Sequence, residues 1–257
     1  MDIARPGDDD KLVQSVQRAF AVVDVLREAG TVRIDDVAST LDIPTSTAHV
    51  HLKTLEATGY VLRDSEGYRL SCRFLRDGMT VRHRKNVYQS TKGEVEDLAD
   101  VTGEVANLGI EENGQRVILY QAEGTEAVYD NAPVGEHTEM HWTALGKAIL
   151  AHLPEDYVDR IVEVYGLPES TANTITARDR LDEELARIRD RNYALEDEER
   201  REGIRSLASP VVVEDDVVGA ISVSGPKERF DDGRIEDELL PELRNAVNVV
   251  EVKYAYD

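Results

Sequence analysis

Cysteine is almost absent from this chain, because Cys72 is the only one among 257 residues. A single cysteine excludes a disulfide framework and a multi-cysteine zinc site, and we expect it to be a buried thiol. Long apolar runs are also missing: the longest, such as Val211-Val212-Val213, are far too short to span a bilayer. No charged-then-apolar signal segment opens the chain. We therefore expect a cytoplasmic protein with no membrane partner.

Basic residues are scarce, since 30 Lys and Arg face 52 Asp and Glu and the net charge is −22. This balance at first argues against a nucleic-acid partner. However, residues 1–90 hold 13 bases and 13 acids, so the whole excess of acid lies in residues 91–257. The neutral part of the chain remains compatible with DNA. The acidic part suggests a salt-rich, halophilic cytoplasm, with an ordinary acidic protein as the alternative.

Residues 34–70 read as helix, tight turn, helix and short hairpin. Apolar residues recur at Ala48, Leu52 and Leu55, the one-face spacing of a helix. Pro44 favours a helix start, and Thr45 or Ser46 could cap the first amides. The rest of this helix is polar and has no core to bury it, which suits a DNA groove.

A hairpin follows the second helix directly, with strands at residues 60–62 and 68–70 joined through Ser65-Glu66-Gly67. Helix-turn-helix plus hairpin is the winged-helix arrangement, and an ordinary small helical domain is the alternative. The residues expected to face DNA are Arg18, Thr45, Ser46, Thr47, His49, Val50, Lys53, Thr54, Arg63 and Arg69.

An amphipathic helix over residues 12–29 precedes this motif, with Ser15 as a candidate cap and a stripe that includes Val16, Phe20 and Leu26. Phe74 to Lys85 reads as a charged linker helix. Beyond it, strands are expected at residues 105–110, 117–121, 127–131, 204–213 and 217–224, and helices at 87–101, 143–153, 154–165, 176–191 and 235–254. Thr176 and Asp179 have capping-box spacing. This is an α+β layout.

Several motifs in order make the chain resemble the IclR family of bacterial and archaeal transcription regulators. They are Ser15-Val-Gln-Arg-Ala19, Ile43-Pro-Thr-Ser-Thr47, Met140-His-Trp-Thr-Ala-Leu-Gly-Lys-Ala148, Tyr193-Ala-Leu-Glu-Asp-Glu-Glu199, Gly203-Ile-Arg-Ser-Leu-Ala-Ser-Pro210 and Ile221-Ser-Val-Ser-Gly-Pro226. With the acidic composition, the chain resembles a haloarchaeal member of that family.

The resemblance implies a winged helix-turn-helix domain (residues 1–72), a linker helix (73–88) and a GAF-like effector domain (89–257). It also implies a homodimer or homotetramer that binds a palindromic double-stranded operator and responds to a small metabolite, often a carboxylic acid, without a cofactor or metal. Such a protein is more often a repressor or dual regulator of a catabolic operon. The effector site carried over from the family is Ala127, Thr138, Ala144, Leu145, Glu196, Ile204, Ser206, Ser222 and Ser224, and Thr143, at the start of a helix, is added to it.

The residues themselves support such a site. Ser222 and Ser224 share one face of a strand, and the helix that begins near Thr143 offers amides to an anion. Core packing by small residues is the alternative. Three positions depart from the family pattern: Val50 stands where an Arg is common, Glu196 where Asp is usual, and Ser206 where Cys is common. Operator sequence and ligand identity therefore do not carry over.

Two other classes of function compete with a regulator. For an enzyme, His141 beside Thr143 and the serines near Glu196 would be the nucleophilic candidates. Neither Gly-x-Ser-x-Gly, nor a phosphate-binding glycine loop, nor metal-spaced histidines occur, and His49 and His51 diverge on a helix. The other competitor is a winged-helix adaptor that binds protein instead of DNA. We expect a regulator with no catalytic residues.

Overall fold

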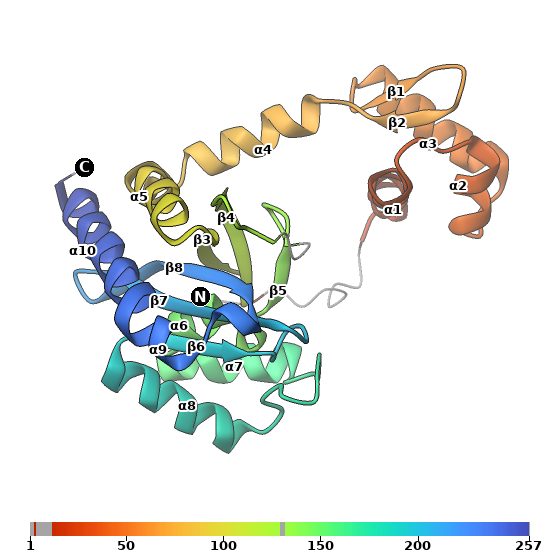
Figure 1. Cartoon of the computed structure of the whole chain (residues 1–257). Helices are drawn as coiled ribbons and strands as arrows, with labels where there is room; N and C mark the ends of the chain where they lie inside the picture. Colours follow the sequence, from red (N-terminus) through yellow and green to blue (C-terminus); the bar gives the residue numbers. More distant parts are fainter. Residues whose placement is uncertain (1–2, 4–11, 129–131, 257) are drawn as a thin grey trace. The chain divides into compact units, whose positions relative to one another are not determined.

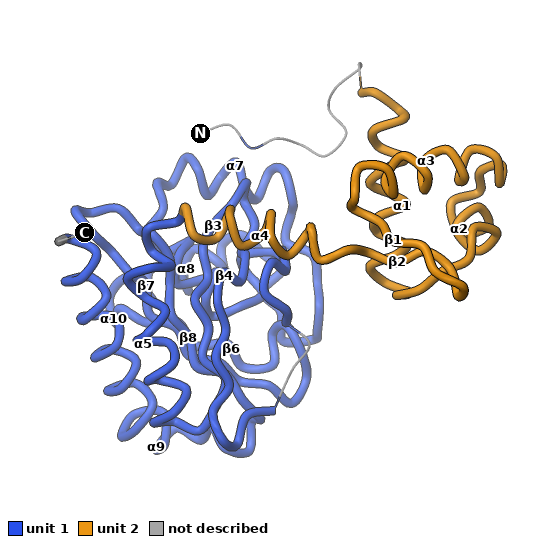
Figure 2. The backbone as a smooth tube through the Cα atoms, turned by 90° about the horizontal axis from the view of Figure 1, so that it is seen from above, with its two compact units in different colours: residues 1–5, 85–257 blue, residues 6–84 orange. Residues whose placement is uncertain are grey.

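The computed structural model describes Ile3 and residues 12–128 and 132–256, and these divide into two compact units. The winged unit reaches from residue 12 to Arg84, and the sheet unit includes Ile3 and residues from Lys85 onward (Figure 2). Within the described residues, none of the helices combines the length and apolar character needed to cross a bilayer.

The winged unit holds helices α1 (Gln14–Ala29), α2 (Ile34–Thr40) and α3 (Thr45–Ala57), then strands β1 (Val61–Arg63) and β2 (Tyr68–Leu70), and ends in α4 (Arg73–His83). The two strands pair antiparallel, with Val61 opposite Leu70. Val32 adds a third short pairing, because its amide and carbonyl both bond to Tyr68, at 2.9 and 2.8 Å. A β-carbon on Gly67 would lie 2.5 Å from the Val32 carbonyl oxygen. Only glycine permits this close approach.

The apolar stripe expected on the first helix is corrected in its N-terminal half. The buried residues of α1 are Val22, Val25 and Leu26, whereas Val16 and Phe20 are 52% and 63% exposed. The reason is that α1 is longer than the core formed by α2, α3 and the hairpin, so only its second half packs against that core. Helix caps also differ from expectation: the residues before α1, α3 and α8 are Val13, Pro44 and Ala177, without a side-chain cap. Ser15, Thr45 and Ser46 therefore lie in the first turns of α1 and α3, one or two residues beyond the cap position.

Helix α4 is anchored to the wing at its first turns. The Tyr60 hydroxyl donates to Asp77 Oδ2 at 2.6 Å, and the rings of Tyr60 and Phe74 meet at 4.8 Å. Arg73 Nη1 donates to the Thr58 carbonyl at 2.5 Å. Cys72, expected to be buried, is exposed, because it lies directly before α4, outside the core that ends at the hairpin. No residue of α4 is buried.

The sheet unit is built on a six-stranded antiparallel sheet in the order β5-β4-β3-β8-β7-β6. Its strands are β3 (Val105–Glu112), β4 (Gln115–Glu123), β5 (His137–Glu139), β6 (Ala194–Asp197), β7 (Ile204–Val213) and β8 (Asp216–Pro226). Of the strand expected at residues 127–131, Ala127 and Val128 lie in a loop, which corrects the expectation for these two, and 129–131 lie outside the described residues. The short β5 instead covers the outer edge of β4.

Helices cover both faces of this sheet (Figure 1). On one face, α5 (Asn86–Thr102) and α10 (Leu240–Tyr256) enclose a core that includes Leu108, Leu207, Ile221 and Val223. On the other, α6 (Ala144–Leu150), α7 (Glu155–Tyr165) and α8 (Arg178–Arg191) form a second core. Side chains alternate between the faces of a strand. The face toward α6 therefore carries small residues such as Gly109, Ala208 and Ala220, which let this helix approach closely.

Short helices join these elements. Met140–Trp142 is one 3-10 turn and Lys227–Arg229 another, and Asp232–Arg234 (α9) leads through a π-helical turn, Ile235–Leu239, into α10. The last helix was expected as one regular helix from 235 to 254, so the π turn is a correction. The helix expected over residues 143–153 is shorter and follows a 3-10 turn, because Thr143 caps it by accepting from the Gly146 amide at 2.9 Å.

Candidate functional sites

Helix α3 presents an outward polar ridge. Ala48 and Leu52 have no exposed surface and hold the helix on the core, while Val50, two residues from each and so on the opposite side of the helix, is 61% exposed. The expected DNA-facing residues of this helix are exposed, except for Thr47, which is half-buried. The Thr54 hydroxyl donates to the Val50 carbonyl at 2.7 Å, so it serves the helix itself in this state.

The wing carries two arginines that its own residues hold. The Arg63 guanidinium lies over the Tyr68 ring at 5.3 Å, and Arg69 Nε lies 3.4 Å from Asp64 Oδ2. Asp64 also accepts from the amides of Glu66 and Gly67, and these bonds lower the pKa of its carboxyl. These hydrogen bonds fix the hairpin turn. Both arginines lie on the exposed surface of the hairpin. Arg18 lies half-buried on α1.

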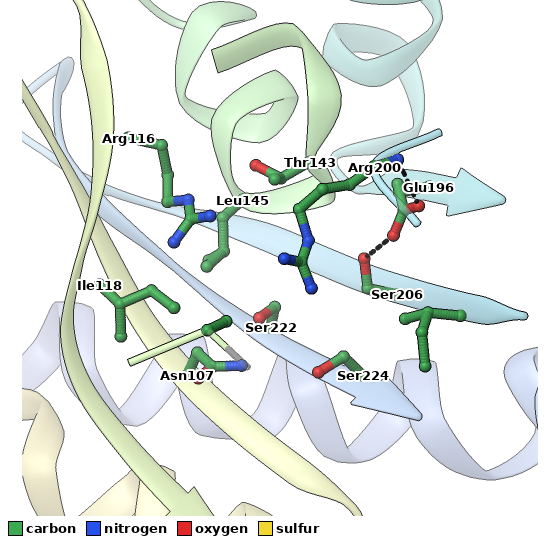
Figure 3. Close-up of a pocket in the computed structure, with 12 residues that line it drawn as sticks. Asn107, Arg116, Ile118, Thr143, Leu145, Glu196, Arg200, Ser206, Ser222 and Ser224 are labelled. Atoms are coloured by element: carbon green, nitrogen blue, oxygen red, sulfur yellow. Dashed lines mark hydrogen bonds between the residues drawn. The ribbon is translucent and has the colours of Figure 1, made fainter. Parts of the chain in front are cut away.

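A small cavity of about 30 Å³ lies on the sheet face that α6 covers. Strands β3, β4, β7 and β8 form its floor and sides, and the start of α6 and the turn after β6 close it (Figure 3). The lining residues are Asn107, Arg116, Ile118, Ala132, Thr143, Leu145, Glu196, Arg200, Ile204, Ser206, Ser222 and Ser224. Eight of these twelve residues have polar or charged side chains.

Glu196 is the buried carboxyl of this wall, with 2% of its surface exposed. Its Oε2 accepts from the Ser206 hydroxyl at 2.7 Å, and its Oε1 accepts from the amides of Glu199 and Arg200 at 2.8 and 3.2 Å. Burial raises the pKa of Glu196 to about 7, against the opposing effect of these hydrogen bonds. The carboxyl is consequently part protonated near neutral pH.

A buried ion pair supports the turn behind Glu196. Lys147 on α6 is 1% exposed, and its Nζ donates to Glu199 Oε1 and, at 2.9 Å, to the Leu195 carbonyl. Burial raises the pKa of Glu199. The Thr174 hydroxyl donates to the Glu199 carbonyl at 2.6 Å. These bonds connect α6 to the turn that carries Arg200.

Helix α6 lies tightly against the preceding 3-10 turn. A β-carbon on Gly146 would lie 2.0 Å from the Met140 carbonyl oxygen. On the sheet side, one on Gly109 would lie 3.0 Å from Leu145 Cδ1. Gly146 therefore allows α6 to pack closely against the 3-10 turn, and Gly109 allows Leu145 of α6 to pack closely against the sheet.

The structure brings together seven of the ten effector residues expected from the sequence: Thr143, Leu145, Glu196, Ile204, Ser206, Ser222 and Ser224. Three are not on the wall. Ala144 is buried in the core beneath α6, because it lies about 100° around the helix from Leu145. Ala127 is in the loop after β4. Thr138 is on the edge strand β5, directly opposite Arg116.

Sequence reasoning missed five lining residues: Asn107, Arg116, Ile118, Ala132 and Arg200. Arg116 and Ile118 are two apart on β4 and share a face, but only the sheet order brings that face to the cavity. Asn107 required the register, because it lies opposite Ser222 and therefore shares its face. Arg200 lies in a turn, where no periodicity applies.

Comparison with known proteins assigns both units. The pattern described as "IclR helix-turn-helix domain" matches residues 15–65, and "Bacterial transcriptional regulator IclR C-terminal" matches residues 79–252. The chain belongs to the IclR family. It is therefore a transcriptional regulator of the IclR type, with a helix-turn-helix domain and an α+β C-terminal domain. This confirms the family and the fold class expected from its motifs.

Individual IclR proteins match over nearly the full length. A relative of Halobacterium salinarum, described as "Probable HTH-type transcriptional regulator ArcR", is 30% identical over 95% of each chain. The crystal structure of the Thermotoga maritima IclR superposes with a TM-score of 0.81 at 27% identity, covering 94% of this chain and 99% of that one. An IclR homolog of Microbacterium hydrocarbonoxydans, solved with 4-hydroxybenzoate, shares the fold at 22% identity, with a TM-score of 0.78 over 95% of this chain and 100% of that one.

Proposed function

We propose that this IclR protein binds a palindromic operator in double-stranded DNA and that a small metabolite in the cavity beside Glu196 alters its affinity for that operator. The observation that carries the proposal is the cavity lined largely by polar residues, which lies in the same chain as an exposed polar helix α3. The hydroxyl, amide and charged groups of this wall are of the kind that hydrogen-bond a small polar ligand. The protein acts where DNA is, in the cytoplasm, as a repressor or dual regulator of a catabolic operon.

The DNA contacts are assigned to α3 and the wing. Thr45, Ser46 and Thr47 at the start of α3, with His49 and Lys53 further along, are placed to reach phosphates and base edges. Val50 supplies an apolar contact of the kind a thymine methyl group offers. The other DNA contacts in this proposal are Thr54, Arg63 and Arg69, with Arg18 on α1.

The effector is assigned to the cavity, with a carboxylate or a sugar-derived catabolite as its class. Glu196, Ser206, Ser222 and Ser224 provide hydrogen-bond partners, with Thr143, Leu145 and Ile204 around them. The 4-hydroxybenzoate bound by the Microbacterium hydrocarbonoxydans homolog supports a carboxylate. The protein binds this molecule without transforming it.

A second copy of the chain is assigned to the apolar surface of the winged unit. Leu12, Val13, Val16 and Phe20 around the start of α1 are exposed, and α4 adds Leu75, Met79 and Val81. Exposed apolar side chains grouped along one helix, as on α1 and on α4, mark a candidate interaction site. Because a palindromic operator presents two equal half-sites, a two-fold dimer is the assembly that reads it, and two dimers form a tetramer.

Genome-wide mapping of the DNA bound by this protein tests the first part and supplies operator fragments. Operator affinity is then measured by fluorescence anisotropy at one fixed salt concentration, with and without metabolites of the adjacent genes. We expect defined palindromic sites and a change in affinity of at least fivefold with one metabolite, because only a ligand with different affinities for two arrangements shifts them. Absence of specific sites would favour the adaptor alternative, and unchanged affinity with a ligand that does bind would remove the allosteric claim.

A further inference from the structure

One residue near the start of the chain belongs to the sheet unit. Ile3 is grouped with the residues from Lys85 onward, whereas residues 12–84 form the winged unit. The half-buried side chain of Ile3 packs against the core that α6, α7 and α8 form on one face of the sheet. The chain therefore leaves the sheet unit after Ile3, forms the winged unit, and returns to the sheet unit at Lys85.

Ile3 lies against the turn between β3 and β4. A β-carbon on Gly114, in this turn, would lie 3.3 Å from Ile3 Cδ1. It would also lie 3.4 Å from Ile161 Cγ1 and 2.8 Å from Tyr165 Cε2, both on α7. The three side chains thus meet over a residue that has no side chain, and its φ of +82° also favours glycine. We name Gly114, Ile161 and Tyr165 the Ile3 socket.

Hydrogen bonds tie the socket together within the sheet unit. The Tyr165 hydroxyl donates to the Asn113 carbonyl at 2.8 Å, and the Tyr157 hydroxyl donates to Glu111 Oε1 at 2.7 Å. Glu111 Oε1 also accepts from the Gly114 amide at 2.6 Å. These bonds hold the β3–β4 turn on α7. The sheet unit therefore sets the shape of the socket, and Ile3 fills it.

The sequence around Ile3 supplies a single aliphatic anchor. Residues 1–11 read Met-Asp-Ile-Ala-Arg-Pro-Gly-Asp-Asp-Asp-Lys, in which Ile3 is the one branched aliphatic residue. The aspartates, the arginine and the lysine around it favour contact with water. Burial of the isoleucine side chain is favourable because it removes apolar surface from water. Ile3 is therefore the residue through which this segment binds the sheet unit.

The other connection to the winged unit is fixed at the same turn. Lys85 lies between α4 and α5, and its Nζ donates to Glu112 Oε2 at 3.1 Å. Glu112 ends β3, two residues before Gly114. Beyond the turn, β4 continues into the wall of the cavity through Arg116 and Ile118. Both chain connections to the winged unit thus meet the sheet unit at the β3–β4 turn.

From this arrangement we propose that the N-terminal segment is a strap, in which Ile3 in its socket gives the winged unit a second attachment to the sheet unit. A body held at one flexible joint rotates about it, and a second attachment restricts that rotation. Val13, the residue before α1, is ten positions beyond Ile3, and a chain of that length extends at most about 35 Å. Covalent continuity alone therefore keeps the start of α1 within this distance of the socket while Ile3 is bound. The strap does not require the function proposed above.

Hydrogen exchange of the full chain, without an N-terminal tag, tests whether Ile3 binds the socket. Ile3→Ser removes the apolar side chain without adding a charge, and Ile3→Leu keeps it. We expect amides of the β3–β4 turn and the end of α7 to exchange about fivefold faster in Ile3→Ser, because less buried apolar surface opposes local opening. Ile3→Leu should exchange at nearly the parent rate.

Val252→Ser removes an apolar side chain that is 59% exposed elsewhere in the sheet unit and is the matched control. It should leave exchange at the turn unchanged. Equal exchange at the turn in Ile3→Ser and the parent would overturn the inference.

Spin labels test whether the bound Ile3 restrains the winged unit. Because Cys72 is the only cysteine, Cys72→Ser gives a background without thiols. Gln14→Cys on α1 and Glu155→Cys on α7, both exposed, then place one label on each unit. Labelled chains are diluted with unlabelled chains, so that pulsed electron resonance measures distances within one chain. We expect Ile3→Ser to broaden the distance distribution and to move its upper limit outward.

An unchanged distribution in Ile3→Ser would overturn the strap even where exchange at the turn has changed. Operator binding by the same preparations keeps this inference apart from the proposed function. A parent protein that binds its operator and responds to a metabolite, with Ile3→Ser identical to it in exchange and distances, would contradict only the strap. A parent protein without operator sites, in which Ile3→Ser changes both measurements, would contradict only the proposed function.

Discussion

The hydroxyl of Ser206 donates a hydrogen bond of 2.7 Å to Glu196 Oε2, across two strands that place these residues directly opposite each other. Since Glu196 is 2% exposed, this bond and two backbone amides replace the water that a carboxyl normally contacts. They do not fully compensate for burial, which raises the pKa of Glu196 to about 7. The charge of Glu196 in the cavity therefore changes with pH near neutrality.

Glu196→Gln should make stability less dependent on pH. A carboxyl with a folded pKa near 7 and an unfolded value of 4.5 stabilises the fold most when protonated, and this contribution is lost as pH rises from 4.5 through 7. The full difference is about 3 kcal/mol. We expect the variant to gain stability relative to the parent as pH rises from 5 to 8, measured by urea unfolding of the sheet unit.

Exposed Glu202 provides the control, and Glu202→Gln should not alter the pH profile. If Glu196→Gln and the parent lose stability equally between pH 5 and 8, Glu196 does not hold its proton as described.

Lys147→Met should destabilise the sheet unit strongly. The substitution leaves the carboxyl of Glu199 buried without its cation, and breaking a buried pair on one side costs about 3–5 kcal/mol. Adding Glu199→Gln should recover most of the loss, because both charges are then absent. Lys92→Met removes an exposed pair with Glu96 and should cost below about 1 kcal/mol. Chemical denaturation measures all four proteins, and a double variant no better than Lys147→Met would contradict this account.

Lys53→Ala should weaken binding to all operator sequences by the same factor and leave effector binding unchanged. If Lys53 neutralises one phosphate, the slope of log affinity against log salt should fall in magnitude by about 0.9. Fluorescence anisotropy over a salt series gives this slope. Lys253→Ala, on half-exposed Lys253 of α10, is the control. Equal operator affinity and slope for Lys53→Ala and the parent would show that Lys53 is only solvated.

Phe20→Glu should shift the protein toward monomers. Phe20 is 63% exposed on α1, and a carboxylate at this position in a dimer contact would be desolvated without a partner. Sedimentation velocity over a concentration series measures the assembly. Val252→Glu changes an apolar residue of similar exposure, 59%, in the sheet unit and should leave the dimer intact. An unchanged dimer in Phe20→Glu would move the contact away from α1.

Local patterns predicted most of the elements. The helix spacing of Ala48 and Leu52, and the alternation along β7 and β8, depend on residues close together in the chain, so periodicity finds them. The exposure of the first half of α1 could not be predicted from this spacing, because burial depends on which neighbouring element reaches Val16 and Phe20. The stripe itself was present, but the core beside it ends earlier. The loop at Ala127 and Val128 was read as a strand for the same reason, since apolar alternation does not show whether a partner strand is adjacent.

The sequence by itself determined the family, the two kinds of domain and seven of the cavity's lining residues. Only the tertiary structure decided that Arg116, Arg200 and Asn107 join them. These residues come from strands and a turn that meet through the sheet order β4-β3-β8-β7-β6, and no spacing along the chain encodes that meeting. The charge of a cavity is the sum over residues distant in sequence, so it becomes defined only when the chain has folded.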